Sequence, residues 1–108
     1  MRARWRDLAE QVRRSARIAV DRPLDRLDEA HLSNQLNHTG AAELPIDGES
    51  GKRIRVAFVE ACRAMLLATG ERRAIAAELA AAAADAVLNL LDLETRAAAA
   101  GWQKQFRD

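Results

Sequence analysis

The feature that most constrains this chain is a long alanine-rich stretch at residues 71–100. Thirteen of its thirty residues are Ala, and it contains neither Gly nor Pro. Alanine has the highest helix propensity and no helix breaker interrupts the stretch, so we predict one long helix here. A helix this apolar needs partners that cover it. The stretch therefore favours an interaction protein over an enzyme.

The rest of the chain predicts further helices. Apolar residues recur at helical spacing over residues 3–20, 24–37 and 51–69, and no stretch alternates with the period of a strand. A loop is predicted over 38–51, which is punctuated by Gly and Pro. The helix at 51–69 is apolar nearly all round, so we expect it to be the central and most buried one.

The short break at Thr69 and Gly70 leaves little chain between the last two predicted helices. Such a short connection is typical of an antiparallel pair. We therefore predict an all-α fold in one domain over residues 1–108. Its form is a small four-helix bundle with a long C-terminal antiparallel helical hairpin, in which the last helix covers 71–100.

Apolar residues of the last predicted helix follow a heptad rhythm, with Leu79, Ala86 and Leu93 recurring every seven residues. A second series follows the first by four residues. Small Ala between larger Leu lets two antiparallel helices approach closely. We predict that this seam is an oligomer interface, formed by Leu79, Ala83, Ala86, Leu90, Leu93 and Ala97.

Charge alternates in blocks: the net charge is +4 over residues 1–22, −5 over 23–51, +4 over 52–73 and −3 over 74–100. Four arginines of the first predicted helix share a sector of about 60°: Arg2, Arg6, Arg13 and Arg17. Four acids of the last predicted helix form a stripe at heptad spacing: Glu71, Glu78, Asp85 and Asp92.

Two interpretations of this arginine stripe stay open. It can dock on the acidic stripe of the last helix, in the same or a neighbouring subunit. Alternatively, it can bind an external anion, either a nucleic-acid backbone or an acidic protein groove. We favour the internal or intersubunit pairing, because the net charge of the whole chain is only +1.

Three of the four aromatic residues lie in the two end segments of the chain: Trp5, Trp102 and Phe106. Either both ends fold onto the bundle and complete its core, or these side chains anchor a partner, since aromatic residues dominate interface energetics.

Motifs of known chemistry do not supply a catalytic site. Residues 58–91 are roughly similar to the opening of the helix-turn-helix of repressors and phage packaging proteins, but the second turn is missing. Residues 48–53 lack the first Gly and the Ser or Thr of a phosphate-binding loop. His31 and His38 match no metal-ligand spacing, and Cys62 is expected to be a buried, inert thiol. We predict no catalytic residue, no metal and no cofactor.

The sequence thus predicts a non-enzymatic helical interaction protein: an accessory subunit, adaptor, inhibitor or assembly scaffold. The expected partner is a second copy, forming a dimer, or a larger protein subunit. The alternative is a nucleic-acid-binding regulator or phage-type packaging component that uses the arginine stripe. One cysteine and the absence of an uninterrupted apolar run of about 20 residues predict a cytoplasmic protein without a membrane partner. High Ala and Arg content is typical of a GC-rich bacterial or phage gene.

Overall fold

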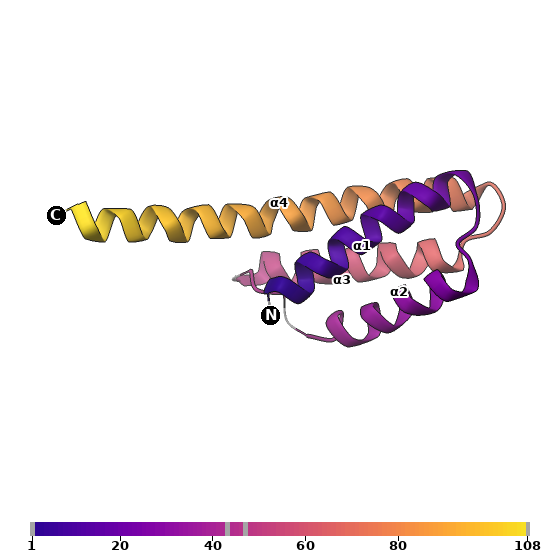
Figure 1. Ribbon diagram of the computed structural model, residues 1–108, viewed down its shortest axis with the longest axis horizontal. Helices are drawn as coiled ribbons and strands as arrows, with labels where there is room; N and C mark the ends of the chain where they lie inside the picture. The colour runs from indigo at the N-terminus through magenta and orange to yellow at the C-terminus, as the bar shows by residue number, and fades with distance from the viewer. Residues whose placement is uncertain (1, 43, 47, 108) are drawn as a thin grey trace.

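The computed structural model describes residues 2–42, 44–46 and 48–107, with side chains described from residue 3 to residue 93 of these ranges. Its elements are four helices: α1 (Arg2–Asp21), α2 (Arg26–Thr39), α3 (Gly48–Leu67) and α4 (Arg72–Arg107). No strand occurs among the described residues, so the predicted all-α class is confirmed. Figure 1 shows α1, α3 and α4 running alongside one another, with α2 on the far side from α4.

Local signals explain the helix boundaries. The side chain of Asp25 accepts a hydrogen bond from the backbone N–H of Asp28 at 2.7 Å and caps the start of α2. The third helix begins at Gly48, three residues earlier than predicted, where a φ of 85° suits glycine. Gly70, with a φ of 60°, allows the turn between α3 and α4.

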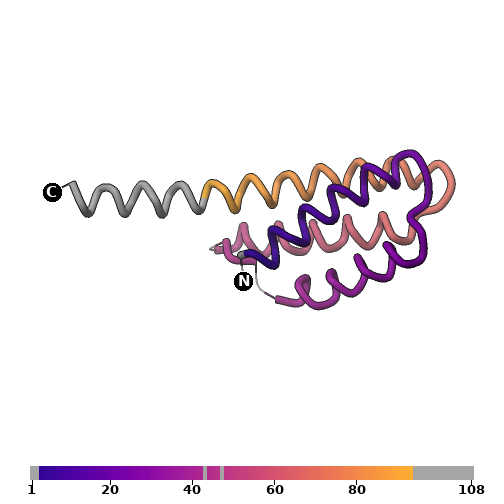
Figure 2. The backbone as a smooth tube through the Cα atoms, in the orientation of Figure 1, coloured from indigo at the N-terminus to yellow at the C-terminus, as the bar shows by residue number. Residues whose placement is uncertain are grey.

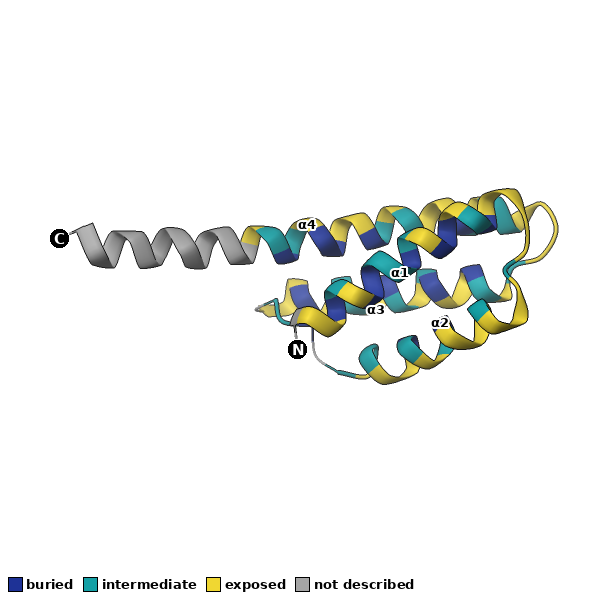
Figure 3. Cartoon of the chain, viewed as in Figure 1, coloured by how far each residue is buried: buried dark blue, intermediate teal, exposed yellow. Residues whose placement is uncertain are grey.

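The prediction that the third helix is the central, most buried one is wrong. Seven residues of α1 are buried against its neighbours: Trp5, Leu8, Ala9, Val12, Ser15, Ala16 and Ala19. On α3, by contrast, Val56 is exposed and Leu67 is 82% exposed. Figure 3 shows exposed residues along the length of α3. The reason is that no other helix among the described residues covers this outward side of α3, which also carries the exposed Arg53, Glu60 and Arg63.

The most extensive helix contact joins α1 and α4. Both helices bring nearly or fully buried alanines to the core: Ala9, Ala16 and Ala19 from α1, and Ala77, Ala80 and Ala84 from α4. Small side chains allow close approach of the two backbones. The helix α3 also contacts α4, which is consistent with the predicted antiparallel hairpin, and α2 contacts α1 and α3.

Candidate interaction surfaces

The helix α4 has two apolar faces. The inner face lies in the core and consists of Ala77, Ala80, Ala84, Val87, Leu88 and Leu91. At 100° per residue, a second set falls within a sector of about 80° on roughly the opposite side of the helix. We call this set the outer face: Ile75, Leu79, Ala82, Ala86, Leu90 and Leu93.

The predicted seam lies on or beside this outer face. Leu79 is 62% exposed and Leu93 57% exposed, and Ala86 is also exposed. Ala83 and Leu90 are half-buried. Ala97 lies outside the residues whose side chains are described. A single chain therefore leaves most of the seam uncovered, and its role as an oligomer interface stays a prediction.

At its N-terminal end, the outer face continues into a shallow hollow of about 380 Å³. The hollow lies where α3 ends and α4 begins, and apolar side chains dominate its lining: Leu67, Ile75 and Leu79, with Ala64, Ala68, Ala76 and Arg72. Apolar surface is thus continuous from the end of α3 onto α4.

The arginine stripe meets the acidic stripe within the chain. Arg6 Nη2 donates to Asp92 Oδ1 at 2.6 Å, and Arg13 Nη1 donates to Asp85 Oδ1 at 3.2 Å. The hydrogen bond and the charge of Asp92 raise the pKa of Arg6 above its usual value. The internal pairing therefore accounts for two of the four arginines. Arg17 is exposed, and the side chain of Arg2 lies outside the described ones.

Helix geometry explains why only two of the four acids of the stripe form ion pairs with α1. An α-helix drifts by about 20° per heptad. From Glu78 to Asp92 this drift brings Asp85 and Asp92 toward α1 and leaves Glu78 nearer the outer face, whereas Glu71 precedes α4. Glu71 and Glu78 are exposed and form no ion pair with the side chains that the structure describes.

Trp5 is not available as a partner anchor. Its side chain is fully buried and packs against Phe58, with ring centroids 6.2 Å apart and an interplanar angle of 59°. The interpretation that this end completes the core is therefore correct for Trp5, because the ring bridges α1 and α3. Trp102 and Phe106 lie outside the residues whose side chains are described.

Cys62 is buried on α3, and burial raises the pKa of its thiol from 9.0 to about 12. The thiol is therefore protonated and shielded at neutral pH, as expected of an inert cysteine. Within the described side chains, no group of three His, Cys, Asp or Glu could hold a metal ion.

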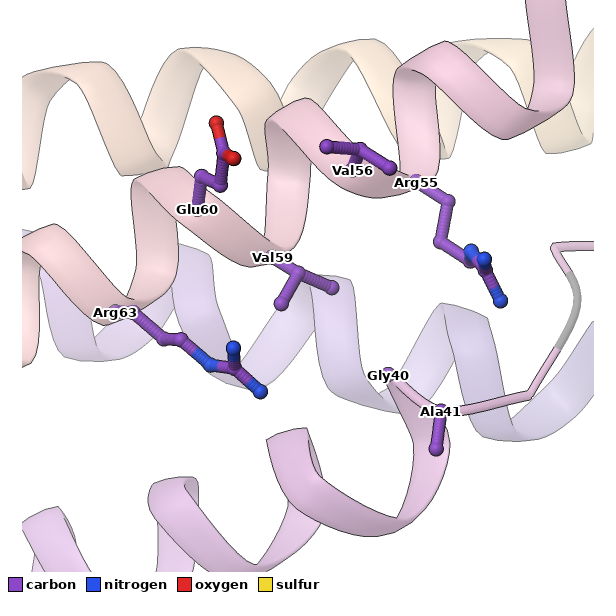
Figure 4. A pocket seen from close by; sticks show the side chains of 7 residues that line it. All are labelled: Gly40, Ala41, Arg55, Val56, Val59, Glu60 and Arg63. Atoms are coloured by element: carbon purple, nitrogen blue, oxygen red, sulfur yellow. The ribbon is translucent and has the colours of Figure 1, made fainter.

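A groove between two helices was not predicted from the sequence. It lies between the C-terminal end of α2 and α3, encloses about 320 Å³, and is lined by Gly40, Ala41, Arg55, Val56, Val59, Glu60 and Arg63 (Figure 4). Arg55 Nη1 donates to the carbonyl of Ala42 at 3.2 Å. The spacing of Arg55, Val59 and Arg63, every fourth residue, was the available signal, but only the fold brings α2 beside it.

By length and mean hydropathy alone, residues Glu71–Leu93 could also cross a membrane, although charged residues such as Glu78 and Asp85 interrupt the segment. The core helix of a soluble protein meets the same criterion. In this fold, one face of the segment packs on α1 and α3. Figure 2 traces this part of α4 along α1.

No family model matches the chain, and no match is found among curated proteins or solved structures. The functional argument therefore rests on the surfaces described above.

Proposed function

We propose that this chain is a non-enzymatic helical interaction protein that binds its partner through the outer face of α4. One observation carries the proposal: large apolar side chains line up on the side of α4 that faces away from the core, including Ile75, Leu79 and Leu93. Single exposed apolar residues are common on protein surfaces, but an aligned stripe marks a contact surface. From residue 75 to residue 93 the stripe is about 27 Å long.

The partner that fits this face best is a second copy of the chain. A dimer with two-fold symmetry requires a patch that complements itself. On the outer face, Ala82 and Ala86 lie between the larger Leu79 and Leu93. These small residues near the middle of the stripe allow two antiparallel copies of α4 to approach closely. The leucines at each end of the stripe then pack against the other copy. A larger protein subunit with a similar helix is the other partner class.

The experiment is light scattering in line with size-exclusion chromatography over a range of protein concentrations. We expect the wild type to form a dimer and the double variant Leu79→Lys, Leu93→Lys to be a monomer with unchanged helical circular dichroism. The matched control is Leu27→Lys, because Leu27 is 80% exposed and lies on α2. A wild type and a double variant with the same mass at every concentration would contradict dimer formation through this face.

The alternative is a nucleic-acid-binding regulator or packaging component that uses the arginine stripe. It is less well supported, because Asp92 and Asp85 neutralise Arg6 and Arg13. Nucleic acid that copurifies in the same chromatography, seen as excess absorbance at 260 nm and lost on Arg17→Ala, would favour it over dimer formation.

A further inference from the structure

We propose that the groove between the end of α2 and α3 is a second docking site, which takes an acidic helical segment of a partner protein. We call it the Arg55–Arg63 groove. Because α2 contacts α1 and α3 but not α4 within the described residues, the groove is separate from the outer face of α4. The inference therefore goes beyond the function proposed above and does not depend on it.

The arginines are placed to hold two separate negative charges. Arg55, Val59 and Arg63 recur every fourth residue of α3, so the two arginines are about 12 Å apart along the helix axis. Figure 4 shows both guanidinium groups extending toward the end of α2, with Val59 between them and Glu60 pointing away. The site thus combines two cationic ends with an apolar floor.

These two cations lack ion-pair partners of the kind that Arg6 and Arg13 of α1 have. Among the described residues, neither Arg55 nor Arg63 forms an ion pair. Arg55 donates one hydrogen bond to the carbonyl of Ala42, which leaves most of its five N–H donors free, and no described group accepts a bond from Arg63. No ion pair within the described part of the chain therefore neutralises either arginine, and the acid that lines the groove, Glu60, points away from both guanidinium groups (Figure 4).

Gly40 holds the groove in shape. A Cβ at this position would collide with the carbonyl oxygen of Leu36 and lie 3.2 Å from Cγ2 of Val59. The missing side chain lets the end of α2 lie close to α3 at the floor of the groove. The distance between the two walls of the groove, the end of α2 and α3, therefore depends on the absence of a side chain at residue 40.

The chain itself shows what such a pair of arginines binds. On α4, Asp85 and Asp92 stand two helical turns apart and pair with Arg13 and Arg6 of α1. A partner helix with two carboxylates at similar spacing and an apolar residue between them would match the Arg55–Arg63 groove in the same way. Charge-assisted bonds between arginine and carboxylate make such a contact specific.

A nucleic acid fits the groove less well. The C-terminal end of α2 borders it, and the end of a helix carries partial negative charge. This charge repels a dense row of phosphates more than two spaced carboxylates, and the apolar floor at Val59 offers phosphates no contact.

The test is fluorescence anisotropy with a synthetic alanine-based helical peptide that carries two Glu two turns apart and a Leu between them. We expect the wild type to bind it, and Arg63→Gln to bind about tenfold more weakly, because a charge-assisted bond is lost. Arg63 suits this test because its loss breaks no described contact. The matched control is Arg53→Gln, which removes the same charge from an exposed position of α3 outside the groove.

Three results would overturn the proposal. The first is equal binding of a peptide with Gln in place of both Glu. The second is an unchanged affinity of Arg63→Gln. The third is tighter binding of a single-stranded oligonucleotide with the same dependence on Arg63. The double variant Leu79→Lys, Leu93→Lys should still bind the peptide, so failure of the α4 interface and failure of this groove give different results.

Discussion

The inner and outer faces of α4 are built from the same residue types, yet only one of them is core. Leu91 on the inner face is 1% exposed, whereas Leu93, two residues further along, is 57% exposed. What separates them is the neighbour: α1 brings its own small residues to the inner face and arginines to its acidic edge. An apolar helix face is stabilised when a neighbouring helix buries it. That neighbour must also complement the face in shape and in charge.

The largest expected effect is a difference in stability between alanine variants of these two leucines. We expect Leu91→Ala to lower the free energy of unfolding by about 2–5 kcal/mol, because it leaves a cavity in the core. Leu93→Ala should stay within about 0.5 kcal/mol when the chain is dilute enough to be monomeric. Urea unfolding followed by circular dichroism measures both. Equal losses would show that the outer face is also packed within one chain.

A smaller effect is expected where the helices approach most closely. Ala84 is fully buried on the inner face, so Ala84→Leu should cost about 1–3 kcal/mol through overpacking. Ala82 is exposed on the outer face, and Ala82→Leu should leave the stability of the monomer unchanged while weakening the dimer that we propose. An equal fall in melting temperature in both variants would show that the inner and outer faces of α4 do not differ in packing.

The ion pairs to α1 should contribute less than either apolar contact. Asp85→Asn combined with Asp92→Asn should lower the melting temperature slightly at low salt, and this difference should shrink at high salt because both pairs are partly exposed. Glu71→Gln combined with Glu78→Gln is the matched control and should lower it less. A difference that salt does not change would argue against a Coulomb contribution.

The smallest effect concerns Cys62, which reports on opening of the core. Its pKa is raised from 9.0 to about 12, so burial favours the protonated thiol. The contribution of this pKa shift to the free energy of unfolding is fully present below about pH 9 and is lost as the pH rises toward 12. At pH 8, labelling by a thiol reagent should be slow in the wild type and in Leu93→Ala, and faster in Leu91→Ala. Rapid labelling of the wild type would contradict the burial of this thiol.

Several elements could be predicted because their signals are local. The apolar period and the Ala-rich composition predicted four helices. The matching spacing of arginines and acids favoured a pairing of the two stripes within the chain or between subunits, and the structure shows this pairing within the chain for Arg6 and Arg13. The central position of α1 and the burial of Trp5 were not predictable in this way, because each depends on which helices meet. The same holds for the Arg55–Arg63 groove, whose two walls come from different helices.

The sequence by itself determined the all-α class, the approximate positions of the four helices and the apolar character of α4, since periodicity and propensity act within a few turns of chain. The bounds differ most at two ends, because α3 begins at Gly48 rather than at residue 51 and α4 extends to Arg107 rather than to residue 100. Only the tertiary structure decided which face of α4 became core. With apolar residues on opposite sides, α4 can bury either face. The choice depends on the neighbours that match it, which are α3 and, with the most extensive contact, α1. The helix α1 brings alanines to the contact and places Arg6 and Arg13 opposite Asp92 and Asp85. The large apolar side chains Ile75, Leu79 and Leu93 of the outer face stay exposed in the single chain.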